Sequence, residues 1–425
     1  MEREKITSER LGDSYYKVNH HSGLTIYLYP KEGWSSSYAI FGTKYGSIDN
    51  CFQRSDEPNP EHVPEGIAHY LEHKLFESED GDAFAKYAAT GASANAFTSF
   101  ESTCYLFSCT DRLYDSLEIL LDFVQSPYFT EQTVAKEQGI IGQEIKMYDD
   151  DPQWRVMFNF LRAMYHSHPV KDDIAGTVES IAKITPEYLY RCYDTFYNLN
   201  NMALSVAGDL EVDRVLEVCD RLLKPSKPVS VRRIFEEEPV SVVKPFVEER
   251  LSVASPLFQF GFKEPVRAEH RSEKDMAAME VLLDLLVSDS SVLFRQLLDD
   301  GLINEASFGY EYFEGAGFAS VLFSGESRDP KQVSERICDE VERLKREGIR
   351  EEDFLRSRNA LYGRSLSSLN SVSALANGLI HYSFKERELF RSIDSLAELT
   401  LQEVQERLAV LDSGKSVLSV ILPQE

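Results

Sequence analysis

The chain has 425 residues, of which 43% are hydrophobic and 27% are charged, and its formal net charge is −26. This composition is that of a globular protein and excludes a disordered or fibrous chain. The negative charge argues against binding to nucleic acid or to an anionic membrane surface, and it indicates solubility or a preference for cationic peptides.

The N-terminal segment and the cysteines bear on the compartment. The segment MEREKITSER lacks the apolar core of a secretory signal, and no stretch reaches the ~18 apolar residues of a membrane span. The six cysteines are scattered without a C-x-x-C spacing, which argues against disulfides and against a cysteine zinc site. We therefore expect a cytoplasmic protein without a membrane partner, in which histidine and carboxylate would hold any metal.

The first half of the chain is predicted from its apolar periodicity. Its predicted elements are, in chain order, a strand at 38–45, helices at 66–75 and 82–89, strands at 92–99 and 103–110, a helix at 112–124, a long helix that begins at 130, a helix at 186–197 and a strand at 202–207. The hydroxyls of Thr130 and Thr133 offer a cap at the start of the long helix.

The second half repeats much of this order. Its predicted elements are a strand at 257–262, a helix at 275–287, strands at 305–312 and 317–324, helices at 331–346, 351–369 and 401–411, and a strand at 416–422. The intervening segment 224–239 is rich in proline, serine and charge, which is typical of a linker. Adjacent strand pairs followed by helices predict an α+β protein. We expect two homologous domains, at 1–228 and 240–425, each a mainly antiparallel sheet covered by helices.

The first predicted helix of the chain carries the segment His69-Tyr70-Leu71-Glu72-His73. Histidines four residues apart lie on one helix face, so both imidazoles can reach one zinc ion. Glu72 projects near the same face and can take a proton from a zinc-bound water. This is the H-x-x-E-H order, the inverse of the commoner H-E-x-x-H. Two incidental histidines on a surface helix are the alternative.

Two glutamates on the later long helix strengthen this hypothesis. Glu137 and Glu144 are seven residues apart, so they share a helix face two turns along. Glu144 would be the third zinc ligand, and the fourth position would hold water, as in catalytic sites. Glu137 would support the site by orienting a ligand, or would belong to a solvated helix face.

These segments resemble the insulinase and pitrilysin family of zinc peptidases, which includes the mitochondrial processing peptidase. The resemblance rests on the H-x-x-E-H motif, on Glu144 in EQGIIGQEIKMYDDDP, and on GASANAFTSFESTCY, HPVKDDIAGTVESI and NNMALSVAGDL. It extends over nearly the whole chain, whose length fits the short, two-domain bacterial-type branch and its zinc-bearing subunit. It implies a zinc metalloendopeptidase whose catalytic residues are Glu72 and Glu137.

The resemblance also implies how substrate binds. In such enzymes an extended peptide joins a sheet edge within an enclosed chamber, and the matching edge here is 92–99. Its substrate-binding residues would be Asn95, Ala96 and Phe97. Asn95 matches the family position whose amide points at the reacting carbonyl, although a polar residue at a strand edge is an equally good interpretation.

The second half departs from the family pattern in two ways. Its counterpart of the histidine helix has no histidine, and Ser357 and Arg364 stand where the two glutamates stand in the first half. Self-sufficient relatives also carry an arginine and a tyrosine that contact substrate. In VLFRQLLDDGLINEASFGY the arginine position falls on Leu297 or Leu298, and Ile303 and Asn304 follow the Gly-Leu pair in place of a tyrosine. Arg295 and Tyr310 lie nearby but out of phase.

The departures leave two assemblies open. One is a homodimer, and the other is a heterodimer in which a paralogue supplies the arginine and tyrosine. The alternative to an active peptidase is a non-catalytic scaffold, or a zinc-bearing half that needs its paralogue. Scaffold members of the family typically have a broken metal motif, whereas this motif is complete.

Overall fold

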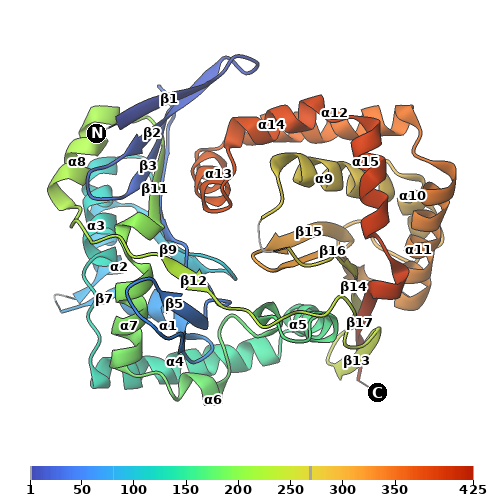
Figure 1. Ribbon diagram of the computed structural model, residues 1–425, viewed down its shortest axis with the longest axis horizontal. Coiled ribbons are helices and arrows are strands. Elements are labelled where there is room, and N and C mark those ends of the chain that lie inside the picture. Colours follow the sequence, from blue (N-terminus) through green and yellow to red (C-terminus); the bar gives the residue numbers. More distant parts are fainter. Residues whose placement is uncertain (1, 80, 268–269, 425) are drawn as a thin grey trace. The chain divides into compact units, whose positions relative to one another are not determined.

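The computed structural model describes residues 2–79, 81–267 and 270–424, and the chain forms two compact units (Figure 1). Unit 1 comprises Met1–Ile145, Asp173–Ile234 and Ser367–Leu389. Unit 2 comprises Lys146–Asp172, Phe235–Leu366 and Phe390–Glu425. The domain boundaries predicted at 1–228 and 240–425 divide the sequence into two consecutive halves. Each compact unit also contains a segment from the other half of the chain, so the two divisions are not equivalent and the predicted boundaries stay a prediction.

Unit 1 is built on a sheet with the strand order β1-β2-β3-β11-β4-β10-β9. Only the β3–β11 pair of this sheet is parallel. Its strands are β1 (Glu2–Ser8), β2 (Asp13–Asn19), β3 (Thr25–Pro30), β4 (Ser37–Thr43), β9 (Ser93–Thr98), β10 (Thr103–Cys109) and β11 (Met202–Gly208). Its helices include α1 (Ile67–Leu75), α2 (Ala83–Thr90), α3 (Leu113–Val124), α4 (Glu131–Asp149), α6 (Val178–Ile181), α7 (Pro186–Phe196), α8 (Val212–Leu222) and α13 (Val372–Phe384). Short strands β5 (Cys51–Arg54), β6 (Glu61–His62), β7 (Glu77–Ser78), β8 (Gly81–Asp82) and β12 (Val231–Arg233) complete the unit.

The middle of this sheet is covered on both faces, and its edge is not. Helix α3 packs on β4 and β10, while α13 packs on β4, β11 and β3 (Figure 1). All seven residues of β4 and all seven of β11 are therefore buried, and both strands are almost wholly apolar or small. The edge strand β9 instead alternates between exposed and half-buried residues. Its outer side is available for pairing with another chain.

Unit 2 repeats this arrangement with the strand order β13-β17-β14-β16-β15, in which β13–β17 is parallel and the other pairs are antiparallel. Its strands are β13 (Phe246–Leu251), β14 (Leu257–Lys263), β15 (Gly309–Gly315), β16 (Phe318–Glu326) and β17 (Ser416–Pro423). Its helices are α5 (Pro152–Met164), α9 (Glu273–Val287), α10 (Val292–Asp299), α11 (Pro330–Glu347), α12 (Glu351–Ser368), α14 (Leu389–Glu398) and α15 (Leu401–Arg407). The order matches β3-β11-β4-β10-β9 strand for strand. This confirms the predicted α+β class with two homologous, mainly antiparallel sheets covered by helices.

The two units exchange corresponding helices. Helix α5 follows α4 in the chain, yet it packs on β17, β14 and β13 of unit 2. Helix α13 follows α12, the counterpart of α4, and packs on β11, β4 and β3 of unit 1. Each of the two helices therefore covers the sheet of the other half of the chain, on equivalent strands.

Three sequence predictions differ from the structure. The helix predicted at 401–411 is α-helical only over Leu401–Arg407 and is followed by a 3₁₀ helix at Leu408–Val410. The strand predicted at 305–312 begins only at Gly309, because the Asn304 side chain accepts hydrogen bonds from the backbone N–H groups of Ala306 (2.9 Å) and Ser307 (3.1 Å) and holds a turn. The predicted linker 224–239 contains β12, which pairs with β5. Arg233 of β12 forms an ion pair with the buried Asp49, so this part of the linker is anchored to unit 1.

The structure also bears on membranes. Among the residues that it describes, no helix has both the length and the hydropathy that crossing a bilayer requires.

Candidate metal centre and active site

Helix α1 carries the histidine motif, and its apolar side fixes its orientation. Ile67, Leu71 and Leu75 are buried, and the helix packs against β9 and β10. Gly66 precedes the helix with φ 84°, and a Cβ there would lie 2.4 Å from the carbonyl oxygen of Ala175. Only glycine meets both constraints without strain. The start of α1, and with it the direction of the motif, is therefore set by packing.

The two histidines of the motif meet Glu144 of α4. Their ring centroids are 4.6 Å apart, as expected one helical turn apart. The Nε2 of His69 lies 3.7 Å from Glu144 Oε1, and the Nε2 of His73 lies 3.4 Å from Glu144 Oε2. The structure thus brings together the three predicted ligand side chains from two helices that are far apart in the sequence.

This arrangement fits a zinc ion. In a tetrahedral site with bonds of about 2.0–2.1 Å, neighbouring ligand atoms lie about 3.3 Å apart, close to the distances observed. His69 is only 8% exposed, and its buried Nδ1 has no hydrogen-bond partner within the described residues, so the ring presents Nε2 to Glu144. Burial and the neighbouring His73 lower the pKa of His69 to about 4. The imidazole is then neutral at neutral pH, which is the form that binds a metal.

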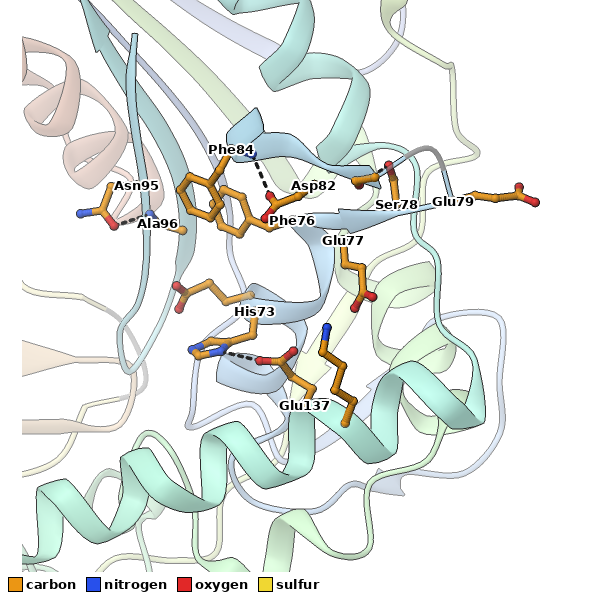
Figure 2. Close-up of a pocket in the computed structure, with 13 residues that line it drawn as sticks. His73, Phe76, Glu77, Ser78, Glu79, Asp82, Phe84, Asn95, Ala96 and Glu137 are labelled. Atoms are coloured by element: carbon orange, nitrogen blue, oxygen red, sulfur yellow. Dashed lines mark hydrogen bonds and ion pairs between the residues drawn. The ribbon is translucent and has the colours of Figure 1, made fainter. Parts of the chain in front are cut away.

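Glu137 supports this centre through His73. The Nδ1 of His73 lies 3.0 Å from Glu137 Oε1 (Figure 2). Burial works against the charge on both groups, but their hydrogen bond and the neighbouring charges together outweigh it: the pKa of His73 is raised and the pKa of Glu137 is lowered. A carboxylate on Nδ1 fixes the ring orientation and leaves Nε2 to face Glu144. Glu137 therefore faces His73, with 12% of its side chain exposed, and its role as a positioning group stays a prediction.

Glu72 lies beside the same centre and receives a hydrogen bond from the end of β9. The Thr98 hydroxyl donates to Glu72 Oε2 at 2.7 Å, and Thr103 Oγ1 lies 3.4 Å from Thr98 Oγ1. Burial raises the pKa of Glu72, and the Thr98 hydrogen bond offsets part of that effect. A carboxylate with a raised pKa accepts protons more readily, as a general base requires.

The edge strand β9 lies next to Glu72 and His73. Asn95 and Ala96 line a pocket with these two residues, whereas Phe97 is 40% exposed and is not part of its lining. The Asn95 side chain accepts a hydrogen bond from the Ala96 N–H at 2.9 Å (Figure 2). A peptide that pairs with the backbone at Ala96 would therefore have to displace the Asn95 amide.

The pocket has a volume of about 490 Å³ and combines an aromatic wall with charged groups. Phe76 and Phe84 stack with ring centroids 4.4 Å apart and planes at 11° (Figure 2). The charged lining residues are Glu72, Glu77, Glu79, Asp82, Lys136 and Glu137. The pocket therefore offers an apolar, aromatic surface next to the candidate catalytic carboxylate, within a mainly acidic lining.

The corresponding place in unit 2 holds a charge pair. Asp284 on α9 is 2% exposed, forms an ion pair with Arg364 on α12 and accepts a hydrogen bond from the Tyr310 hydroxyl at 3.1 Å. Ser357, at the position of the first glutamate, is fully buried. An arginine and an aspartate thus link α9 and α12 of unit 2, whereas histidine and glutamate link the corresponding helices α1 and α4 of unit 1.

Sequence reasoning missed Thr98 and the two phenylalanines. Thr98 lies two residues after Ala96 on the same strand, so the two side chains share one face of the sheet. Its spacing of two residues from Ala96, a proposed substrate-binding residue, is the signal that could have identified it as part of the site. No comparable signal pairs Phe76 with Phe84, because their contact depends on how α2 packs after α1.

Comparison with known proteins adds an independent result. Residues 59–178 match the family model of insulinase (peptidase family M16), and residues 183–361 match that of the peptidase M16 inactive domain. A Bacillus subtilis protein named uncharacterized zinc protease YmfH is 41% identical over 406 residues, which are 94% of this chain and 94% of that protein. The chain belongs to peptidase family M16. The resemblance to the insulinase family is thus confirmed.

Solved structures agree with membership of M16. A crystal structure described as an M16-like peptidase from Alicyclobacillus acidocaldarius has a TM-score of 0.93 and 36% identity, over 96% of this chain and 98% of that one. Pitrilysin shares the fold at 17% identity, with a TM-score of 0.76. The match covers 100% of the present chain but 47% of the pitrilysin chain. This M16 chain therefore corresponds to about half of pitrilysin.

Proposed function

We propose that this M16 chain is a zinc-dependent endopeptidase that hydrolyses extended peptides, with Glu72 as general base. The observation that carries the proposal is the convergence of His69, His73 and Glu144, with Glu72 on the same helix. The residues supply two imidazoles and one carboxylate, and three protein ligands leave a coordination position for water or substrate. Relatives named zinc proteases support the metal and the activity.

A bound zinc ion would lower the pKa of a water molecule and polarise the scissile carbonyl. The residues of the chain do the rest. Glu72 accepts the proton of the attacking water and delivers it to the nitrogen of the departing amine. Thr98 holds one oxygen of that carboxylate, at 2.7 Å, so that the other oxygen is directed to the water. Glu137 keeps the His73 ring in place.

The substrate would bind as a further strand beside β9. Main-chain hydrogen bonds to this edge give affinity with little dependence on sequence, and they require an extended peptide. Once its side-chain oxygen is released from the Ala96 N–H, the Asn95 side chain could turn and donate its NH2 group to the carbonyl of the peptide. A large apolar side chain of the substrate would enter the pocket against Phe76 and Phe84. Substrates would therefore be unstructured peptides with such a residue next to the cleaved bond.

We further propose that the active form is a dimer. The chain corresponds to about half of pitrilysin, so a second chain would complete the substrate chamber. The positions expected to hold the substrate-contacting arginine and tyrosine favour a paralogue over a second copy. The arginine position falls on Leu297, which is buried, or on Leu298, which is partly buried, and Ile303 after the Gly-Leu pair is buried. The Tyr310 hydroxyl is bonded to Asp284. With such a paralogue, the chain would be the zinc-bearing subunit of a heterodimer, as opposed to an enzyme that is active by itself.

Metal content and turnover, measured together, test the proposed function. Protein desalted into metal-free buffer should keep about one zinc per chain, and His73→Ala should lose it. Glu72→Gln should keep the zinc but lose roughly 10²–10⁴-fold in cleavage of a quenched fluorescent peptide. Near-normal cleavage by Glu72→Gln, or by the chelated protein, would refute the proposal. A non-catalytic scaffold would bind zinc without cleaving peptide, even after the paralogue is added.

A further inference from the structure

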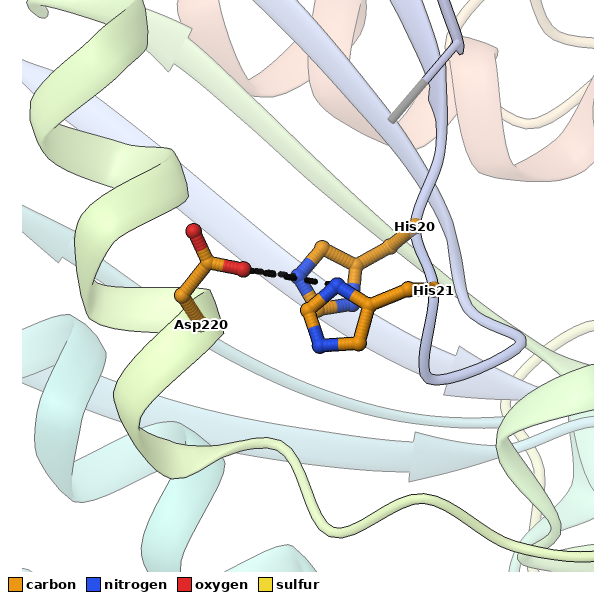
Figure 3. A group of neighbouring side chains, drawn as sticks. All are labelled: His20, His21 and Asp220. Atoms are coloured by element: carbon orange, nitrogen blue, oxygen red, sulfur yellow. Dashed lines mark hydrogen bonds and ion pairs between the residues drawn. The ribbon is translucent and has the colours of Figure 1, made fainter.

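A second group of possible metal ligands lies at the turn that joins β2 to β3. The chain reverses at 20–23, where the Gly23 N–H donates to the His20 carbonyl at 3.0 Å and the His20 N–H donates to the Leu24 carbonyl at 2.9 Å. Neighbouring side chains of a strand point to opposite faces, but the turn directs both His20 and His21 toward α8 (Figure 3). There they meet Asp220, which follows His20 by 200 residues in the chain.

The distances among these three side chains suit a metal ion. The Nε2 of His20 lies 3.1 Å from Asp220 Oδ1, and the Nδ1 of His21 lies 3.5 Å from the same oxygen. The ring centroids of the two imidazoles are 4.1 Å apart. All three ligand atoms lie within 4.8 Å of one another. The edge of a tetrahedron with zinc–ligand bonds of about 2.0–2.1 Å is about 3.3 Å, and the two measured distances fall on either side of it.

His20 is positioned as metal-binding histidines commonly are. Its side chain is buried, and its Nδ1 lies 2.8 Å from the Ser22 hydroxyl. Nδ1 also accepts a hydrogen bond from the Ser22 N–H at 3.2 Å, so the ring orientation is fixed from behind and Nε2 faces Asp220 Oδ1 at 3.1 Å. A metal ion at Nε2 would take the place of the proton that Nε2 shares with Asp220. His21 and Asp220 are exposed, with 58% and 42% of their side chains accessible, so an ion can reach the site from solvent.

Hydrogen bonding between histidine and aspartate does not account for both imidazoles. His20 is within hydrogen-bond distance of Asp220, but His21 at 3.5 Å is held only as a neighbour of the shared oxygen, and no hydrogen bond of its ring occurs within the described residues. Both imidazoles thus lie next to the same carboxylate oxygen, and only one of them is hydrogen-bonded to it. A cation placed between the three groups would bind all of them.

We propose that His20, His21 and Asp220 form a second metal site, distinct from the one on α1 and α4, for a divalent transition metal ion such as Zn²⁺. Imidazole ligands suit zinc, copper and nickel, whereas Mg²⁺ and Ca²⁺ prefer oxygen ligands. Water completes the coordination, because the site is open on its outer side. The ion links the β2–β3 turn to α8 and so stabilises the folded unit 1. With two exposed ligands the site binds more weakly than the buried centre.

The experiment separates the two sites by mutation and uses tag-free full-length protein. Zinc is titrated into His73→Ala, His73→Ala/His21→Ala and His73→Ala/Asp220→Asn while heat of binding and Tm are followed. His73→Ala should bind about one ion saturably, with a rise in Tm that excess chelator reverses, because an ion that binds only the folded state stabilises it. Both double variants should lose the binding and the rise in Tm. His73→Ala/His166→Ala, which removes an exposed histidine of unit 2, should behave like His73→Ala.

Metal-dependent signals decide the outcome, so a change in the basal Tm of a variant has no bearing on it. Equal zinc binding by His73→Ala and its His21→Ala or Asp220→Asn derivatives would overturn the proposal, and so would the lack of a saturable site in His73→Ala. The result is independent of the proposed peptidase. If Glu72→Gln showed that the α1 site is not catalytic, the titration of His73→Ala would still report on the second site.

Discussion

The hydroxyl of Thr98 lies 2.7 Å from a carboxylate oxygen of Glu72, so the edge strand that would receive substrate also positions the candidate general base. Replacement of Thr98 by valine keeps the shape of the side chain and removes the donor. A hydrogen bond to a charged group contributes about 1.5–3 kcal/mol. We expect kcat to fall about tenfold with KM almost unchanged, since tenfold corresponds to about 1.4 kcal/mol.

Thr98→Ser provides the control for this prediction, because it keeps the hydroxyl and should restore most of kcat. Steady-state kinetics with one quenched peptide measure both constants. If the valine and serine variants were equally impaired, the effect of position 98 would be one of packing and not of hydrogen bonding.

Removal of the charge at Glu137 should weaken zinc binding. In Glu137→Gln the amide can still contact His73, but it cannot stabilise the ring as a carboxylate does. Partners of this kind are worth about 10- to 100-fold in metal affinity. Competition with a chromophoric chelator measures the dissociation constant. Glu131→Gln, on an exposed position of the same helix, is the matched control. Unchanged affinity in Glu137→Gln would place this carboxylate outside the metal centre.

Specificity should depend on the aromatic wall of the pocket. Phe84→Ala removes one of the two stacked rings while leaving Phe76 and the metal ligands in place. Burying a large apolar side chain contributes about 1.5–3 kcal/mol, so kcat/KM for peptides with phenylalanine next to the cleaved bond should fall about tenfold or more. Peptides with alanine there should be cleaved as before. A uniform loss over a peptide library would contradict this role, and Val178→Ala, an exposed apolar site on α6, serves as control.

A buried ion pair in unit 2 should make stability depend on pH. Glu238 accepts hydrogen bonds from Lys263 and from the backbone N–H groups of His166, Ser167 and His168. Burial raises the pKa of Glu238, but these hydrogen bonds outweigh it and leave the pKa below its ordinary value. A lowered pKa in the folded state contributes stability above the unfolded pKa of about 4.3, and that stability is lost as pH falls through the folded pKa.

Glu238→Gln leaves the Lys263 ammonium buried without its partner. At pH 7 we expect the free energy of unfolding in urea to fall by about 3 kcal/mol, with the difference shrinking below about pH 4. Lys263→Met in the same protein should recover part of the loss, because no unpaired charge is then left. A difference that stays constant with pH would show that the carboxylate charge is not responsible.

The quaternary prediction concerns activity and mass together. Purified chain should bind zinc but cleave peptide slowly, and a paralogue that carries the arginine–tyrosine pair should raise kcat/KM by on the order of 10²-fold, since misplaced substrate costs about that much. Light scattering coupled to gel filtration gives the mass in each case. Full, chelator-sensitive activity of a homodimer, unchanged by Arg295→Ala and Tyr310→Ala, would show that no donated pair is needed.

The local elements and the metal motif could be predicted from the sequence because they depend on short-range patterns. The spacing of His69 and His73 fixes a shared helix face, and that of Glu137 and Glu144 fixes another, whatever the rest of the fold does. Repetition of strand and helix order indicated two related domains. The alternation of apolar and polar residues has one period in a helix and another in a strand, and it extends over a few consecutive residues. Helices and strands can therefore be predicted from a single sequence.

Tertiary structure alone decided which distant residues meet. No sequence pattern indicated that α5 and α13 would change places, that Thr98 would reach Glu72, or that Asp220 would lie beside His20 and His21. These contacts depend on how strands order themselves in a sheet and on which face each helix covers. Strand order and helix packing are determined by the free energy of burying the apolar surface of the whole domain. This free energy is a sum over many distant residues, so it cannot be read from any short segment.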